Sequence, residues 1–258
     1  MAKKFFGKHG GTVLIIVGAI ALYELLTDVV RVLDPMFFPG FSQILPKMGS
    51  SAGLFLKSVI SSMKLLIPGY FFALLAGITI GTIIGLHPLL NKNLKPIIFA
   101  LAPIPPSMLT PYLIAILPTF YLSSVAVIFI GCFWPVLVGT VSGMILIEQG
   151  YLDNADIMGL SRFEKLFYVL LPAASPHILE GASTALNFSF ILLVIAEMFA
   201  TNSGMGYFVQ YYADFSDYSR VLGGLICTSI VVVVIKYTFE AAKRRILFWC
   251  LNSNARMK

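Results

Sequence analysis

The stretch Gln149–Pro176 reads QGYLDNADIMGLSRFEKLFYVLLPAASP and is the longest polar-leaning segment in the second half of a very apolar chain. Helix-forming residues come first, followed by Gly159, a charged patch and a Leu-Pro-Ala sequence. Apolar runs long enough to cross a bilayer flank the stretch on both sides. We therefore expect a short structured loop between two membrane spans, placed to contact a partner in the adjacent water.

The composition excludes an ordinary soluble domain. Hydrophobic residues make up 58% of the chain and charged residues 12%, whereas a soluble domain has about 25% charged residues. Such a chain cannot cover itself with polar surface, so the bilayer is its natural solvent. Its 258 residues have room for roughly six helical spans of about 20 residues with short loops. We therefore predict an all-α membrane protein with a single transmembrane domain over residues 1–258.

The distribution of charge argues against nucleic-acid binding, although the net charge is +6. The basic residues gather before the first apolar run and after the last one: Lys3, Lys4, Lys8, Lys243, Arg244, Arg245, Arg256 and Lys258. Basic ends that flank apolar spans follow the positive-inside rule. Both termini are therefore expected in the cytoplasm, which requires an even number of crossings. A cleaved signal peptide is disfavoured, because the first apolar run is too long for one.

Hydropathy places the six spans at about 11–30, 64–86, 96–117, 123–147, 178–200 and 221–239. Residues 31–63 are expected outside, with a weakly amphipathic run at the interface, and 87–95 form an inside turn. Two spans carry glycines at four-residue intervals: Gly77, Gly81 and Gly85, and then Gly139 and Gly143. Such small residues let membrane helices approach closely.

The third span contains a cluster of prolines: Pro103, Pro105, Pro106 and Pro111. Each proline removes a backbone donor and clashes with the preceding turn, so a regular helix does not survive here. Non-helical backbone at membrane depth is tolerated only against protein or a watery cavity. We expect a bent or broken helix near a translocation path, with Ser107 and Thr110 facing that path. A structural kink that faces neighbouring helices is the alternative.

The fifth span carries a polar stripe. Its members follow steps of four and three residues and so share one helical face: Ser183, Asn187, Phe190, Val194, Glu197 and Thr201. A carboxylate costs about 2.5–3.5 kcal/mol at the bilayer centre, which makes Glu197 the member that most needs a reason. One interpretation is a translocation pathway lined by Ser183, Asn187, Phe190 and Glu197. The other is a buried hydrogen-bonded seam between helices.

The sequence holds no set of residues that indicates catalysis. It has no G-x-x-x-x-G-K-[ST] pattern for nucleotide phosphates. His9, His87 and His177 are widely separated, and none stands beside a Cys or a carboxylate at ligand spacing. The three cysteines, Cys132, Cys227 and Cys250, are read as small apolar packing residues. We therefore predict a chain that is not itself an enzyme and that binds no cofactor or metal.

The polar loop resembles the cytoplasmic-loop motif of permease subunits of binding-protein-dependent ABC importers. That motif has the form E-A-A, three residues, a Gly, about nine residues, an apolar residue and Leu-Pro. Here Asp153-Asn154-Ala155 stands at the E-A-A position, Gly159 follows at the right spacing, and Leu171-Pro172 closes the motif. Asp in place of Glu and Asn in place of Ala are departures.

Other segments resemble the nitrate/sulfonate/taurine branch of these permeases, and together they cover most of the chain. They are ALYELL at 21–26, FFPGFSQILPKM at 37–48, APIPPSMLTP at 102–111, AEMFATNSGMGYFV at 196–209 and RRILFW at 244–249. One departure lies in the third span, where ILPTFYLSS replaces the usual Trp-Phe-Gly stretch.

The resemblance implies a type I ABC importer permease fold in the bacterial cytoplasmic membrane. It implies a coupling helix at about Tyr151–Arg162 that docks on an ATPase, with Gly159 at the point of closest contact. The coupling residues would be Asp153, Asn154, Ala155, Asp156, Gly159, Arg162, Glu164 and Lys165.

The resemblance also implies partners. These are an ABC ATPase subunit that holds ATP and Mg²⁺, an extracytoplasmic solute-binding protein, and a second, identical permease chain. The transported solute would be small and anionic. An autonomous secondary transporter or channel, driven by an ion gradient, is the rival function. A membrane-embedded enzyme or scaffold is a further rival, and it would need a buried His/Asp/Glu cluster within the spans.

Overall fold

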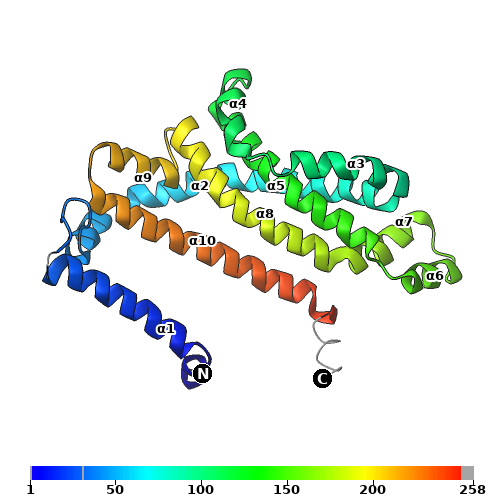
Figure 1. Ribbon diagram of the computed structural model, residues 1–258, viewed down its shortest axis with the longest axis horizontal. Helices are drawn as coiled ribbons and strands as arrows, with labels where there is room; N and C mark the ends of the chain where they lie inside the picture. Colours follow the sequence, from blue (N-terminus) through cyan, green and yellow to red (C-terminus); the bar gives the residue numbers. More distant parts are fainter. Residues whose placement is uncertain (1, 31, 251–258) are drawn as a thin grey trace.

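The computed structural model describes residues 2–30 and 32–250, and within them every regular element is a helix (Figure 1). The predicted all-α class is therefore confirmed. Arg256 and Lys258, two of the basic residues of the C-terminal end, lie outside the described residues. The helices are α1 (Ala2–Glu24), η1 (Leu25–Val29), α2 (Phe41–Leu86), α3 (Pro88–Leu101), η2 (Pro106–Leu109), α4 (Thr110–Ile116), α5 (Phe120–Ile145), α6 (Gln149–Ile157), α7 (Arg162–Lys165), η3 (Leu166–Leu170), α8 (Leu171–Ala200), α9 (Met205–Asp214) and α10 (Tyr218–Ile246).

Four helical stretches of the described chain are long and apolar enough to cross a membrane. They are Phe41–Leu86, Phe120–Ile145, Arg162–Phe199 and Tyr218–Ile246. A fifth is added if α3 and the η2–α4 segment, which meet at a bend of 75°, form one span. The predicted first span, 11–30, falls on α1 and η1 and is not in this set, so the described residues give fewer spans than the six expected.

The broken helix predicted at the proline cluster is confirmed. Regular structure stops after Leu101 and resumes at Pro106, so the break coincides with Pro103 and Pro105. The prediction of a turn at 87–95 is wrong, because α3 begins at Pro88. Proline is well tolerated at the first helical position, where its missing N–H is not needed.

The segment 31–63 was predicted to be separate from the second span, but from residue 41 onward it forms one helix with that span. Helix α2 runs without interruption for 46 residues, or about 69 Å at 1.5 Å per residue. The hydrocarbon core is about 30 Å thick, so a large part of α2 lies beyond it. The helix start is tied to the end of α1, because the backbone N–H of Phe41 donates to Glu24 and the Tyr23 hydroxyl donates to the Pro39 carbonyl.

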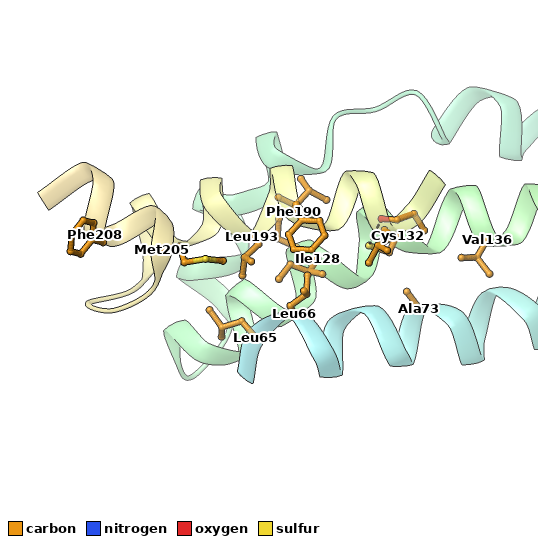
Figure 2. Packing of buried hydrophobic residues seen from close by; sticks show 14 of the residues in the cluster. Leu65, Leu66, Ala73, Ile128, Cys132, Val136, Phe190, Leu193, Met205 and Phe208 are labelled. Carbon is orange, nitrogen blue, oxygen red and sulfur yellow. Dashed lines mark hydrogen bonds between the residues drawn. The ribbon is translucent and has the colours of Figure 1, made fainter. Parts of the chain in front are cut away.

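The core forms where α5 packs between α2 and α8 (Figure 2). Buried side chains from the three helices meet there, among them Leu66, Ile128 and Leu193, and α9 adds Met205 and Phe208. Cys132 is fully buried in this cluster, as its prediction as a packing residue requires.

The glycine pattern has the predicted effect on helix approach. A Cβ atom at Gly77 or Gly81 of α2 would lie 2.7 Å from a side-chain atom of α5. On the opposite face of α5, a Cβ at Gly139 would lie 2.8 Å from the His177 carbonyl oxygen of α8. Real Cβ contacts are essentially never shorter than 3.0 Å, so both helix pairs are closer than any larger residue would allow.

Candidate functional site

The polar loop folds into α6, α7 and η3 and lies at one end of the bundle, whereas α9 lies at the opposite end (Figure 1). Helix α6 covers Gln149–Ile157. The predicted helix over Tyr151–Arg162 therefore begins slightly earlier and ends five residues sooner than expected.

Gly159 explains why α6 ends where it does. Its φ angle is +68°, a left-handed conformation that side chains disfavour and glycine adopts freely. The N–H of Leu160 donates to the Ala155 carbonyl, and the N–H of Gly159 donates to that of Asp156. This is the Schellman arrangement that closes helix C-termini. A Cβ at Gly159 would meet nothing within 4 Å, so within this chain the glycine is required by backbone conformation and not by close packing.

Helix α7 begins with a reciprocal capping box. The N–H of Ser161 donates to the Glu164 carboxylate at 2.8 Å, and the N–H of Glu164 donates back to the Ser161 hydroxyl. The hydrogen bonds from Ser161 lower the pKa of Glu164. The Ser-x-x-Glu spacing is a known helix-start signal, so this local role of Glu164 was readable from the sequence.

Several predicted coupling residues are engaged inside the loop. The ammonium of Lys165 lies 2.9 Å from the Asp156 carboxylate and so ties α7 to α6. Asp153 accepts a hydrogen bond from Gln149 at 3.0 Å, and Ala155 is buried. Asn154 and Arg162 are exposed and remain predicted contacts with a partner.

Several large side chains that the loop exposes are apolar, which the sequence analysis does not predict. Ile157 is 83% exposed and Met158 is 73% exposed, and aromatic rings stand out beside them. We call this set the apolar loop patch: Ile157, Met158, Phe163, Phe167 and Tyr168. The sequence did carry a signal for this patch, namely several large apolar residues within a loop that was expected in water. Single exposed apolar residues are common, whereas clusters of them mark interaction sites.

Replacing Gly159 with alanine is expected to loosen the end of α6. The left-handed conformation costs a non-glycine residue about 1–2 kcal/mol, and no neighbouring atom needs to move. Hydrogen exchange at the amides of Gly159 and Leu160 should accelerate about tenfold, since 1.4 kcal/mol is a factor of ten. The matched control is Gly150→Ala, within α6 and also in open space, which should leave these amides unchanged or slower. Equal exchange in both variants would contradict the conformational account.

The broken span forms the wall of a cleft of about 540 Å³ against α5 and α8. Ser107 lines this cleft, together with mainly apolar side chains such as Trp134, Phe188 and Ile191. Thr110 is almost fully buried, and its hydroxyl has no hydrogen-bond partner in the described chain. The two residues predicted to face one path therefore lie in different surroundings, Ser107 at the cleft and Thr110 inside the protein.

The polar stripe of α8 does not face one common space. The Glu197 carboxylate is fully buried and accepts hydrogen bonds from the Ser62 hydroxyl and the Gly206 N–H. Ser183 donates to Glu240 of α10 at 3.0 Å, and Phe190 belongs to the core. The seam interpretation fits these three residues, whereas Asn187 is exposed and remains a candidate for the pathway.

Residues 73–247 match the family described as binding-protein-dependent transport system inner membrane component, and the chain belongs to this family. It is thus an inner-membrane permease component of a transport system that works with a separate binding protein. The apolar helices and the projecting loop described above fit that class.

Among proteins of this kind, the chain is similar to the taurine transport system permease protein TauC of Escherichia coli (strain K12). The two are 29% identical over 226 residues, which cover 85% of this chain and 82% of that protein. It is also 32% identical over 183 residues to the nitrate import permease protein NrtB of Leptolyngbya laminosa, covering 71% and 65%. The bicarbonate transport system permease protein CmpB of Synechocystis sp. (strain ATCC 27184 / PCC 6803 / Kazusa) is 28% identical over 226 residues, covering 80% and 79%.

The fold is that of a solved ABC transporter. The chain superposes on a structure of the MetNI methionine ABC transporter in an inward-facing conformation with a TM-score of 0.65 and 16% identity, covering 76% of this chain and 98% of that one. At this identity the likeness concerns the fold alone.

Proposed function

We propose that this chain forms the membrane pathway for a small anion, which a binding protein delivers and a separate ATPase drives inward. The observation that carries the proposal is the apolar loop patch, whose side chains are exposed. They belong to the loop that lies at one end of the bundle (Figure 1). Exposed apolar clusters are unfavourable in water, so a protein partner is expected to cover this one.

The ATPase is the partner that we assign to the loop. Helix α6 and the short α7 are fixed to each other by the Asp156–Lys165 ion pair and by the closed turn at Gly159. A loop held in this way moves as one body, so it transmits a push between the ATPase and α8, which follows it directly. Asn154 and Arg162 add polar contacts at the rim of the interface. ATP and Mg²⁺ would be bound by the ATPase subunits alone.

A second copy of the chain completes the pathway in this proposal. Within one chain, α2, α5 and α8 pack into a closed core, so the route has to run along the outside of that core. The cleft beside the broken span contributes Ser107 and is bordered by α8 near the exposed Asn187. We place the route between two such faces, one from each chain.

The proposed orientation has the loop and both termini in the cytoplasm. Helix α1 runs toward the end of the bundle that carries α9, and α10 runs away from that end, so the start of α1 and the end of α10 both lie away from α9 (Figure 1). The basic residues Lys243, Arg244 and Arg245 in the last turn of α10 suit the inner side of the membrane.

The anionic nature of the solute is inferred from the relatives. Their names specify taurine, nitrate and bicarbonate transport, and these solutes share a compact oxyanion group. The solute of this chain is therefore proposed to be a small oxyanion or an organic molecule that carries one.

Native mass measurement of the purified assembly tests the proposed composition. We expect two copies of this 28.3 kDa chain together with two copies of its ATPase. An assembly with a single copy of this chain would contradict the shared pathway. A stable chain that never binds an ATPase would support the rival transporter or channel function.

A further inference from the structure

Two lysines of α2 have no ion-pair partner among the residues that the structure describes. Lys57 and Lys64 are seven residues apart, so they lie on one face of the helix. Lys47 of the same helix is instead paired with Asp217 at 2.8 Å. Over residues 2–30 and 32–250, no carboxylate lies within ion-pair distance of Lys57 or Lys64. Two uncompensated ammonium groups on one helix face, each of which also borders a cleft, offer a place for an external anion.

The surroundings of these lysines are hollow, and they carry hydroxyl and amide groups among apolar side chains. Lys57 borders a cleft of about 440 Å³ with Tyr207 and Tyr211 of α9. Lys64 borders a second cleft of about 240 Å³ with Tyr121 of α5. The two clefts meet at the loop between α8 and α9, because Asn202 and Ser203 line both of them.

The shared loop is held firmly against α2. The hydroxyls of Ser61 and Ser203 are 2.7 Å apart, and Ser61 lies between the two lysines on the helix. On the inner side, Ser62 donates to Glu197 and accepts from the N–H of Met205 at 2.9 Å. The loop therefore keeps its donors beside the lysines.

The carboxylate of Glu197, at the end of α8 that leads into this loop, lines neither cleft. Glu197 is fully buried and is held by Ser62 and the Gly206 N–H. A Cβ at Gly204 would lie 2.3 Å from the Glu197 carboxylate, so the loop backbone closes directly over that group. The clefts are consequently bordered by the two ammonium groups, while the negative charge stays inside the protein.

We propose that this face of α2 and α9, which we call the α2–α9 anion site, receives a small oxyanion at the end of the bundle opposite the ATPase loop. Lys57 and Lys64 attract the anion, and Asn202, Tyr207 and Tyr211 beside them donate to its oxygens. Each ammonium offers three donors, and clefts lined by one sign of charge concentrate ions of the opposite sign. The inference rests on the proposed import of an anion and specifies where that anion first contacts the membrane chain.

The test uses a cysteine at position 61 and two thiol reagents of similar size and opposite charge. In the Ser61→Cys variant, in phosphatidylcholine vesicles, the rates of modification by a sulfonate-bearing and a trimethylammonium-bearing methanethiosulfonate are measured. The quantity of interest is the rate with the sulfonate reagent divided by the rate with the trimethylammonium reagent. Adding Lys57→Gln and Lys64→Gln is expected to lower this ratio about tenfold or more, because two positive charges within roughly 10 Å of the thiol are removed. Lysine-to-arginine changes at both positions should preserve the ratio. An unchanged ratio in the glutamine variant would overturn the proposal.

A matched control removes two lysines elsewhere. Lys92 and Lys95 of α3 follow the far end of α2, whose Leu86 is about 37 Å from Ser61 along the helix. Neutralising Lys92 and Lys95 should not change the ratio of the two rates. If it lowers the ratio as much as neutralising Lys57 and Lys64 does, the effect reflects the overall charge of the protein, and the proposed site is refuted.

Two further arms identify the ligand and separate this inference from the proposed function. Added nitrate should slow the reaction of the sulfonate reagent with the Ser61→Cys variant that keeps both lysines. Slowing only by phosphatidylglycerol in the vesicles would assign the site to lipid headgroups and overturn our proposal.

In the full transporter, the glutamine variant should raise the KM for anion uptake about tenfold, with kcat little changed. Unaltered uptake with a lowered labelling ratio would place the site off the route and refute the inference while leaving the proposed function intact. The opposite outcome is a ratio that depends on the two lysines although even the unmodified chain shows no ATP-driven uptake of taurine, nitrate or bicarbonate. That result would support the site and contradict the proposed function.

Discussion

Replacing Ile157 and Met158 with serine is expected to weaken binding of the ATPase about 100-fold. The two side chains are 83% and 73% exposed, so their removal should hardly affect the fold of this chain. Burying a large aliphatic side chain contributes about 1.5–3 kcal/mol, and two such losses correspond to at least two powers of ten in affinity. The dissociation constant of the ATPase from the detergent-solubilised chain is the measurement.

The control for this double variant is Leu89→Ser. Leu89 is 77% exposed at the start of α3, on an element outside the loop, and its loss should leave ATPase affinity within about twofold, which is under 0.5 kcal/mol. If the Ile157 and Met158 variant binds the ATPase as tightly as the unmodified chain, the apolar loop patch is not the docking surface.

Gly181→Leu is expected to destabilise the whole bundle. A Cβ at Gly181 would lie 2.6 Å from the Pro135 carbonyl oxygen and 3.2 Å from the Cα of Gly139. Backbone atoms of α5 cannot move aside without opening the α5–α8 contact on which the core rests. Overpacking of a tight core typically costs about 1–3 kcal/mol, and contact with backbone atoms of two successive turns of α5 places this site at the upper end. Thermal unfolding should show a loss of roughly 10 °C in Tm.

The matched substitution for this experiment is Gly18→Leu. Gly18 is also in an apolar helix, but a Cβ there meets nothing within 4 Å. Its Tm should stay within a few degrees of the unmodified chain, because an exposed surface change is usually worth less than about 0.5 kcal/mol. A similar loss in both variants would mean that leucine at a membrane glycine is harmful in itself and not through the α5–α8 contact.

Much of the fold was readable from local patterns. Four-residue glycine spacing predicted that the helices now seen as α2 and α5 approach neighbouring helices closely, and the proline cluster predicted a broken helix, which the break after Leu101 confirms. Both features act within a few residues or along one helix face, so a single sequence carries them. The continuous α2 was missed, because Pro46 and the polar residues after it resemble a helix boundary although α2 continues through them.

The candidate site was predicted less completely, and for a different reason. The position of the loop followed from its polarity, but the roles inside it depend on tertiary pairing. Asp156 was expected to face a partner, yet it binds Lys165 across a turn. Glu197 was placed on a polar stripe, yet Ser62 and Gly206, which are distant from each other in sequence, enclose its carboxylate. Contacts of this kind arise from the packing of α2, α8 and α9, which helical periodicity does not encode.

Uptake by proteoliposomes is the measurement that tests the central claim most directly. The vesicles would contain this chain with its ATPase, the binding protein would be added outside, and labelled taurine, nitrate or bicarbonate would be supplied. We expect inward transport of at least one of these solutes that requires ATP inside the vesicles, requires the binding protein, and is lost in the Ile157 and Met158 double serine variant. Equal uptake by this chain alone, driven by an ion gradient without ATP, would contradict the account.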